Sequence, residues 1–210
     1  MIFDNRRHAG ELLSKKLSKL DLDPSDTTIV GITRGGVEVA AAAAKILKIP
    51  LTAVVIKKLG APTNPELAIG ATGAWGTPIL SRWLIRDLAV SGDWLRREIR
   101  SKKKEAKRLE KYLGISSFVD RFRGKKVVIV DDGLATGQTA KAAAKVTREL
   151  GASKVILAIP VGAPSVVESV KSDFDDIVCL VRDPNLEAVG QFYGDFRPVS
   201  DEEVREILNS

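Results

Sequence analysis

Two adjacent carboxylates are the groups in this chain best placed to do chemistry. Asp131 and Asp132 follow the apolar run 127–130 directly, and the segment 133–139 after them carries mostly small or hydroxylated side chains. Capping the next helix would need only one acid, so the second one indicates a polar ligand. Neighbouring carboxylates accept strong, charge-assisted hydrogen bonds from a vicinal diol. The sequence therefore predicts a site for a hydroxylated ligand at the end of a buried strand.

A second turn of small residues follows the apolar run 28–32. It reads Thr33-Arg34-Gly35-Gly36, and glycine lets a ligand approach the backbone closely while the N–H groups of a helix N-terminus attract anions. Neither turn matches the G-x-x-x-x-G-K-S/T or G-x-G-x-x-G fingerprint. Ligands of open α/β sheets bind beyond the carboxyl ends of the strands, so we expect both turns to face one crevice.

Hydrophobic periodicity predicts the elements that hold these turns. Strands are expected at 28–32, 51–56, 126–130, 155–159 and 177–181. Helices are expected at 6–20, 37–47, 93–113, 137–150 and 165–171, and Ser200 with Glu203 forms a capping box for a last helix. Short β-branched runs that alternate with helices predict an α/β fold with a mostly parallel sheet flanked by helices.

The segment 57–81 is too long and too rich in Gly, Pro and Thr for a plain connection. We expect a flexible functional loop in its first half and a hairpin around Gly76 in its second. Lys57 and Lys58 stand where the second strand ends. They are either part of the site or a solvated pair.

Composition restricts the classes of protein. With 210 residues, one cysteine and no apolar run near the roughly 20 residues of a membrane span, we expect a single domain over 1–210, in the cytoplasm, with no membrane partner. The net charge of +6 favours anionic ligands. Much of it lies on the basic helix 93–113, which has few interleaved aromatic residues, so nucleic acid is not an expected partner. His8 is expected on a helix surface and Cys179 in the core.

The run from Val128 to Thr139 closely resembles the signature of the type I phosphoribosyltransferases, whose ligand is phosphoribosyl pyrophosphate. The resemblance implies that Asp131 and Asp132, the catalytic pair, hold the ribose hydroxyls. It implies that magnesium bridges the ligand to these two acids, mainly through the ligand and water. The residues implied for the 5-phosphate are Gly133, Leu134, Ala135, Thr136, Gly137, Gln138 and Thr139.

The resemblance also assigns pyrophosphate to the other turn. Relatives bind it there, often through a cis peptide bond that is not at proline, which we expect between Thr33 and Arg34. Arg34, Gly35 and Gly36 complete that turn, and Arg34 would pair with the leaving group. Lys57 and the catalytic candidate Lys58 match basic residues before a loop that closes over the reaction.

A closer likeness, over nearly the whole chain, connects it to a small group of uncharacterised bacterial and archaeal phosphoribosyltransferases. The shared motifs are D-x-R-x-x-A-G-x-x-L (from Asp4, including Arg6, Ala9 and Gly10), K-L-G-A-P-x-N-P-E-L-A-I-G-A (58–71) and A-V-G-x-F-Y-x-D-F (188–196). The likeness implies the type I fold, with 183–210 as a small hood and C-terminal segment, and a homodimer.

The family chemistry implied is transfer of phosphoribose to an acceptor, a nucleobase or a related nitrogen nucleophile, with release of pyrophosphate. Ala135 stands where the 6-oxopurine enzymes carry a carboxylate base, so either no base is needed there or another acid such as Glu66 supplies it. Leu186, Phe192 and Asp195 are candidates for the acceptor pocket, although packing in the core would suit the aromatic residues equally. The alternative function is a non-catalytic regulator that binds phosphoribosyl pyrophosphate or a nucleotide.

Overall fold

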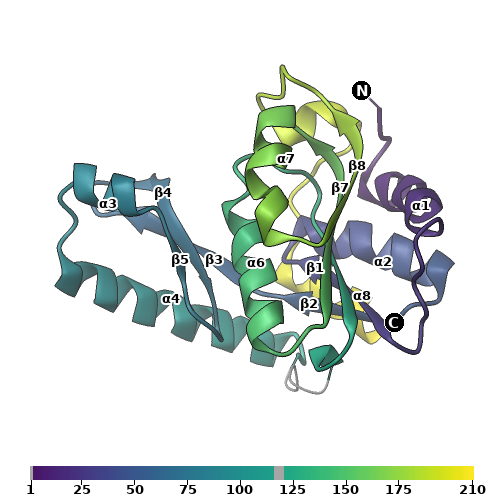
Figure 1. Cartoon of the computed structure of the whole chain (residues 1–210), viewed down its shortest axis with the longest axis horizontal. Coiled ribbons are helices and arrows are strands. Elements are labelled where there is room, and N and C mark those ends of the chain that lie inside the picture. Colours follow the sequence, from purple (N-terminus) through teal and green to yellow (C-terminus); the bar gives the residue numbers. More distant parts are fainter. Residues whose placement is uncertain (1, 116–120) are drawn as a thin grey trace.

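The computed structural model describes residues 2–115 and 121–210. Its centre is a five-stranded parallel sheet in the order β2-β1-β6-β7-β8 (Figure 1). The strands are β1 (Thr27–Ile32), β2 (Leu51–Val54), β6 (Lys126–Val130), β7 (Lys154–Gly162) and β8 (Asp176–Arg182). The predicted α/β class is confirmed. Both faces of β1 are buried, which is why it reads as a continuous apolar run rather than an alternating one.

Helices cover both faces of this sheet (Figure 1). The first pair, α1 (Arg6–Leu17) and α2 (Gly35–Leu47), packs on one face through Leu13, Leu17, Val39 and Ala43. The other face carries α6 (Gln138–Glu149) and α7 (Pro164–Val170). The C-terminal helix α8 (Asp201–Asn209) begins with the predicted capping box and lies against α2 and β2. Helix α1 ends three residues before the predicted boundary at residue 20, because 18–20 form a turn that leads into Asp21 and Pro24.

A projecting unit, here called the arm (56–112), corrects two predictions. The strand expected at 51–56 ends at Val54, and β3 (Ile56–Ala61) starts a separate antiparallel sheet with β4 (Asn64–Gly73) and β5 (Ile79–Leu80). Residues 57–61 and 64–67, in the half where we expected a flexible loop, are therefore in strands, and β4 continues through 68–73, which we expected in the hairpin. The strands on either side of Gly76 do pair, as predicted.

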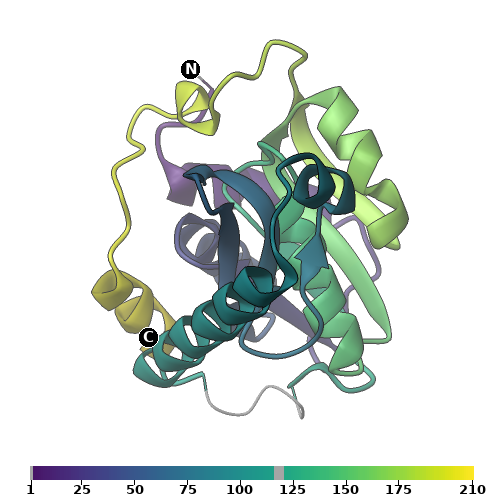
Figure 2. The same cartoon turned by 90° about the vertical axis from the view of Figure 1, so that its left-hand side faces the viewer.

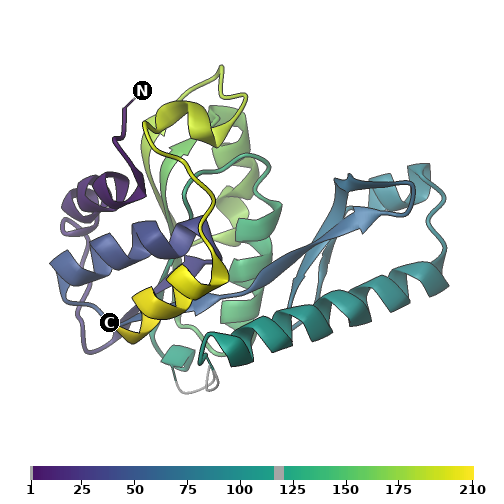
Figure 3. The ribbon, with the colours of Figure 1, turned by 180° about the vertical axis from the view of Figure 1, so that it is seen from behind.

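Burial explains why the polar sequence of the arm still folds as a sheet. Leu59, Ala61 and Ile69 are buried against Leu84 and the partly buried Leu95. These contacts come from α3 (Arg82–Asp87), which the sequence did not reveal, and from α4 (Gly92–Tyr112), the predicted basic helix. Figure 3 shows α4 running the length of the arm back to the central sheet. No helix in the described part of the chain is long and apolar enough to cross a membrane.

Replacing Gly10 with alanine is expected to destabilise the fold, although alanine is the better helix former. A Cβ at Gly10 would overlap the backbone carbonyl of Val39 and lie 2.8 Å from the Cβ of Ala42, so α1 and α2 would have to separate. We expect a loss of about 1–3 kcal/mol in the free energy of unfolding, measured by urea titration. Lys15→Ala, on the exposed side of α1, is the control and should cost nothing. An equally stable Gly10→Ala variant would contradict this packing argument.

Candidate functional site

The two acids lie at the carboxyl end of β6, beneath the C-terminal segment. The backbone N–H of Asp132 donates to Oδ1 of Asp131 at 3.0 Å, and the hydroxyl of Tyr193 donates to the carbonyl oxygen of Asp132 at 2.6 Å. Arg6 donates from Nε to Oδ2 of Asp132 at 2.8 Å. The acids are thus held by α1 and by the segment after β8, as well as by their own strand.

The two predicted turns meet at this point, as expected from neighbouring parallel strands. Because β1 pairs with β6, the turn 33–36 lies beside the acids. A Cβ on Gly36 would be 2.6 Å from the carbonyl oxygen of Val130 and 2.9 Å from the Cα of Asp131, and a Cβ on Gly35 would overlap the Asp132 carboxylate. Only glycine allows this approach. The peptide bond between Thr33 and Arg34 is cis, which confirms that prediction.

Burial sets the electrostatics of the acid pair. Desolvation raises the pKa of Asp131 well above its usual range, and the neighbouring charge of Asp132 raises it further. Desolvation also raises the pKa of Asp132, while the hydrogen bond and charge of Arg6 oppose that rise. Such a pair gains from any ligand that brings hydrogen-bond donors or positive charge to it. The site therefore suits a diol or a hard cation.

The segment 133–139 wraps the opening of α6. Gly137, with φ +75°, is the N-cap of this helix, and a Cβ there would lie 2.5 Å from Val170. Thr136 is exposed at the turn, so its hydroxyl is accessible. Gln138 has a buried Oε1 with no hydrogen-bond partner among the described residues. The turn thus presents backbone N–H groups and hydroxyls at a helix N-terminus, which is the arrangement that binds phosphate.

The predicted basic residues lie in two places. Arg34, in the turn 33–36 beside the acid pair, is half-exposed. Its Nη1 lies 3.6 Å from Oδ1 of Asp201 in the first turn of α8. Lys57 and Lys58 are on β3, at the base of the arm, and neither forms an ion pair with any described residue. Glu66 is exposed on β4, just beyond the turn at the outer end of the arm sheet. The structure thus separates Glu66 from the acids.

The hood residues pack more than the sequence suggested. Phe192 is buried in a cluster with Phe3, Ala9 and Tyr193, and the partly buried Leu186 packs against that cluster. Asp195 is exposed, and its Oδ1 accepts a hydrogen bond from the backbone N–H of Arg197. Figure 2 shows the C-terminal segment crossing from this hood down to α8. An acceptor-binding role for Leu186, Phe192 and Asp195 stays a prediction.

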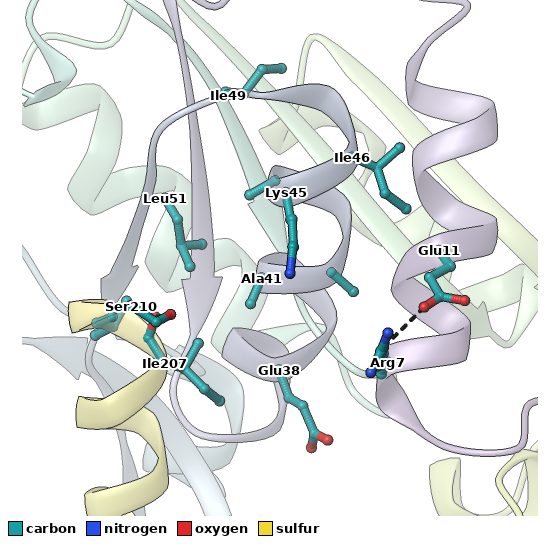
Figure 4. A pocket seen from close by; sticks show the side chains of 13 residues that line it. Arg7, Glu11, Glu38, Ala41, Lys45, Ile46, Ile49, Leu51, Ile207 and Ser210 are labelled. Carbon is teal, nitrogen blue, oxygen red and sulfur yellow. Dashed lines mark hydrogen bonds and ion pairs between the residues drawn. The ribbon is translucent and has the colours of Figure 1, made fainter.

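A separate groove of about 940 Å³ lies between α1, α2 and α8 (Figure 4). Its lining combines apolar residues such as Ile46 and Ile207 with the ion pair of Arg7 and Glu11. Its lining residues from the C-terminal segment, Ile207, Leu208 and Ser210, come from α8, and none of its lining residues belongs to either turn or is one of the acceptor-pocket candidates. This groove is therefore separate from the acid pair and the two turns.

Residues 1–197 match the family described as the phosphoribosyl transferase domain. The chain belongs to this family. The predicted resemblance is thereby confirmed.

The relatives agree with this assignment. Two curated proteins of Mycobacterium tuberculosis, named "Putative phosphoribosyl transferase MT0597" and "Putative phosphoribosyl transferase Rv0571c", are each 39% identical over 214 residues. These matches include 99% of this chain but 46% of each relative, so the chain spans about half their length. The crystal structure of TT1426 from Thermus thermophilus superposes with a TM-score of 0.82 and 36% identity, covering 99% of this chain and 98% of that one. The AQ2163 protein of Aquifex aeolicus shares the fold alone, with a TM-score of 0.52 and 16% identity over 85% of this chain and 74% of that one.

Sequence reasoning missed two residues that contact the acid pair. Arg6 and Tyr193 lie far from Asp132 in the chain, and both reach it by hydrogen bonds. Their signal was present in the two terminal motifs, D-x-R-x-x-A-G and A-V-G-x-F-Y-x-D-F, but neither motif shows what its residues contact.

Proposed function

We propose that this phosphoribosyltransferase domain binds phosphoribosyl pyrophosphate with magnesium and transfers phosphoribose to a nitrogen nucleophile of the nucleobase type. The observation that carries this proposal is the contact between the two turns. The glycine turn 33–36 abuts Asp131 and Asp132 so closely that a Cβ at Gly35 or Gly36 would collide with them. One ligand with a phosphate, a diol and a pyrophosphate would satisfy both turns at once.

Each part of that ligand has a chemical match. The carboxylates of Asp131 and Asp132 would accept hydrogen bonds from the ribose hydroxyls. The N-terminus of α6, with Thr136 and Thr139, would hold the 5-phosphate, and the backbone of the turn 33–36 would hold the pyrophosphate. The exposed ion pair between Arg34 and Asp201 is weak. Arg34 would therefore leave Asp201 and bind the more highly charged pyrophosphate.

The reaction is a substitution at C1 of the ribose. The bond from C1 to the pyrophosphate oxygen breaks, and the nitrogen of the acceptor forms its bond to C1 as pyrophosphate leaves with the electron pair. The transition state has oxocarbenium character, as in glycoside hydrolysis. Catalysis then consists mainly of positioning the reactants and stabilising charge. We propose that Lys58 and Lys57, at the base of the arm, supply positive charge to the departing pyrophosphate.

The proton of the acceptor needs a destination other than Ala135. A methyl group cannot accept a proton, and Ala135 is exposed in the turn 133–139. An acceptor that is already deprotonated, or one that loses its proton to water, suits this site. Glu66 could serve only if the outer part of the arm moved towards the acids, because it lies beyond the β3–β4 turn.

Magnesium fits the donor set of the site. Among the described residues no group of three or more His, Cys, Asp or Glu side chains could hold a metal ion. Asp131 and Asp132 supply hard oxygen atoms, and Mg²⁺ is commonly held by one or two carboxylates together with substrate phosphates. The ion would neutralise charge on the pyrophosphate when bound.

The test is calorimetric titration of phosphoribosyl pyrophosphate, with and without magnesium, into the wild type and an Asp131→Asn/Asp132→Asn variant. Two charge-assisted hydrogen bonds worth about 1.5–3 kcal/mol each are lost, so the affinity should fall at least about 100-fold. Asp87→Asn, at the exposed end of α3, is the control and should bind like the wild type. No binding by the wild type would overturn the proposal. If phosphoribosyl pyrophosphate bound but released no pyrophosphate in the presence of any nucleobase or amine acceptor, the regulatory alternative would be favoured.

A further inference from the structure

Arg6 is a buried cation that joins three segments of the chain at the acid pair. Its side chain is 7% exposed. Its Nε donates to Oδ2 of Asp132 at 2.8 Å, and its Nη1 donates to the carbonyl oxygen of Arg197 at 2.8 Å. The guanidinium carbon lies 3.9 Å from the centroid of the Phe196 ring. One side chain from the first turn of α1 thus contacts the end of β6 and the C-terminal segment.

Burying a guanidinium is costly unless its donors are satisfied. Here the cost is offset by the carboxylate, by the carbonyl and by the face of the aromatic ring. Only arginine matches this arrangement, because its planar fork directs two N–H groups at fixed angles to different acceptors, whereas lysine offers a single ammonium. Glu38, whose Oε2 lies 3.9 Å from Nη1, adds a second negative charge on the side of α2.

The Asp132 carboxylate is left with one oxygen for a ligand. Oδ2 accepts from Arg6, while no other side chain of the described residues donates a hydrogen bond to this carboxylate. The main chain at the same residue is fixed by the hydroxyl of Tyr193. The rotation of the carboxylate and the position of its backbone are therefore both set from outside β6.

We propose that Arg6 is a positioning residue for donor binding, which turns Oδ1 of Asp132 towards the ribose hydroxyls and ties the C-terminal segment 193–197 to the acid pair. This inference rests on the proposed function, because it assigns Arg6 to the ribose half of the same site. Arg6 does not touch the ligand. Its effect on ligand binding should therefore depend on the hydroxyls that Asp132 holds, and not on the phosphate.

That dependence separates positioning from a merely structural role. A residue that only stabilises the fold would, when replaced, weaken every ligand of the site equally or none. A residue that acts through Asp132 weakens only ligands that carry the hydroxyls. The comparison is a double-mutant cycle in which one change replaces Arg6 and the other removes the two ribose hydroxyls. It isolates the free energy of coupling between the side chain and those hydroxyls.

The experiment uses the whole chain with ribose 5-phosphate and its 2,3-dideoxy analogue as probes, and ligand-observed NMR titration as the measurement. Arg6→Met should weaken ribose 5-phosphate about 10- to 100-fold and the dideoxy analogue less than about 3-fold. Arg6→Lys should fall between the wild type and Arg6→Met, because it restores the charge but not the second hydrogen bond. Arg7→Met, the neighbouring exposed arginine, should match the wild type with both probes.

Three outcomes would count against the proposals, and they are distinguishable. A wild type that binds neither probe overturns the proposed function and this inference together. If the wild type binds ribose 5-phosphate more tightly than the dideoxy analogue, and Arg6→Met shows the same ratio of affinities, only the inference about Arg6 is overturned. Should Arg6→Met fail to fold, Arg6→Lys decides the question, since a folded lysine variant with the full wild-type preference for the hydroxyls also overturns it.

Discussion

Replacing Gly35 with alanine is expected to reduce the affinity for phosphoribosyl pyrophosphate by about 10- to 100-fold, the loss that follows when one charge-assisted hydrogen bond is removed. Gly35 is the first residue of α2, and its backbone is packed against the ion pair beneath it. A Cβ there would overlap Oδ2 of Asp132 and lie 2.7 Å from Nε of Arg6. The methyl group would push the carboxylate away from Arg6, so that Oδ1 no longer faces the ligand. The measurement is calorimetric titration in the presence of magnesium.

The control is Gly92→Ala, which also changes the first residue of a helix. A Cβ at Gly92 meets only Nη1 of Arg96, at 3.4 Å, so this variant should bind like the wild type. Alanine at either position also favours the helix, so a fall in affinity at Gly35 alone cannot come from helix propensity. Unchanged affinity in a folded Gly35→Ala variant would show that the acid pair tolerates displacement, and would contradict the close approach of the two turns as the basis of the site.

The central sheet could be predicted from the sequence because each of its strands is apolar on both faces. β6 is a run of Val and Ile after Lys126, and β1 combines Ile and Val with Thr and one Gly. The turns that follow these strands carry the glycines and the acids. Local signals suffice there, since both the strand and its turn lie within a dozen residues. The capping box at Ser200 could be predicted for the same reason, because its two partners lie three residues apart.

The arm could not be predicted in the same way. Its β3 and β4 strands have the Gly, Pro and Thr content of a loop, and only tertiary contacts decide their structure. Leu59 and Ile69 find an apolar partner in α3 and α4, which are distant in sequence. A buried face that is shared between separate elements leaves no periodic pattern in either of them.

The contacts of the acid pair show the same limit at the site. Arg6 lies 126 positions before Asp132, and Tyr193 lies 61 after it. A lone arginine in the first turn of a helix looks like any surface residue until the fold places it. The chemistry of the acids was readable from their types, but the groups that orient them come from the two ends of the domain.

The free energy of unfolding is expected to fall as the pH rises, because the carboxyl group of Glu110 is buried at the base of the arm. Glu110 on α4 is 4% exposed, and desolvation raises its pKa from 4.5 to about 7, against the opposing effects of Trp75 and Lys107. Between these two values the folded chain keeps a proton that the unfolded chain has released. Folding is therefore favoured below about pH 4.5 relative to above about pH 7 by up to about 3 kcal/mol from this one group.

Glu110→Gln should remove that dependence, because glutamine resembles the protonated acid and its Oε1 can still accept the hydrogen bond that Trp75 Nε1 donates at 3.0 Å. We expect the variant to be more stable than the wild type at pH 8 by about 2–3 kcal/mol and nearly equal to it at pH 5, in urea titrations at both values. Glu105→Gln, a more exposed carboxyl on the same helix, should show no such difference. If the wild type and Glu110→Gln lost stability in parallel from pH 5 to pH 8, the carboxyl of Glu110 would have to be ionised in the folded chain throughout. Trp75 would then donate its hydrogen bond to an ionised Glu110 over this whole pH range. It would not donate to a neutral carboxyl group whose deprotonation destabilises the folded chain.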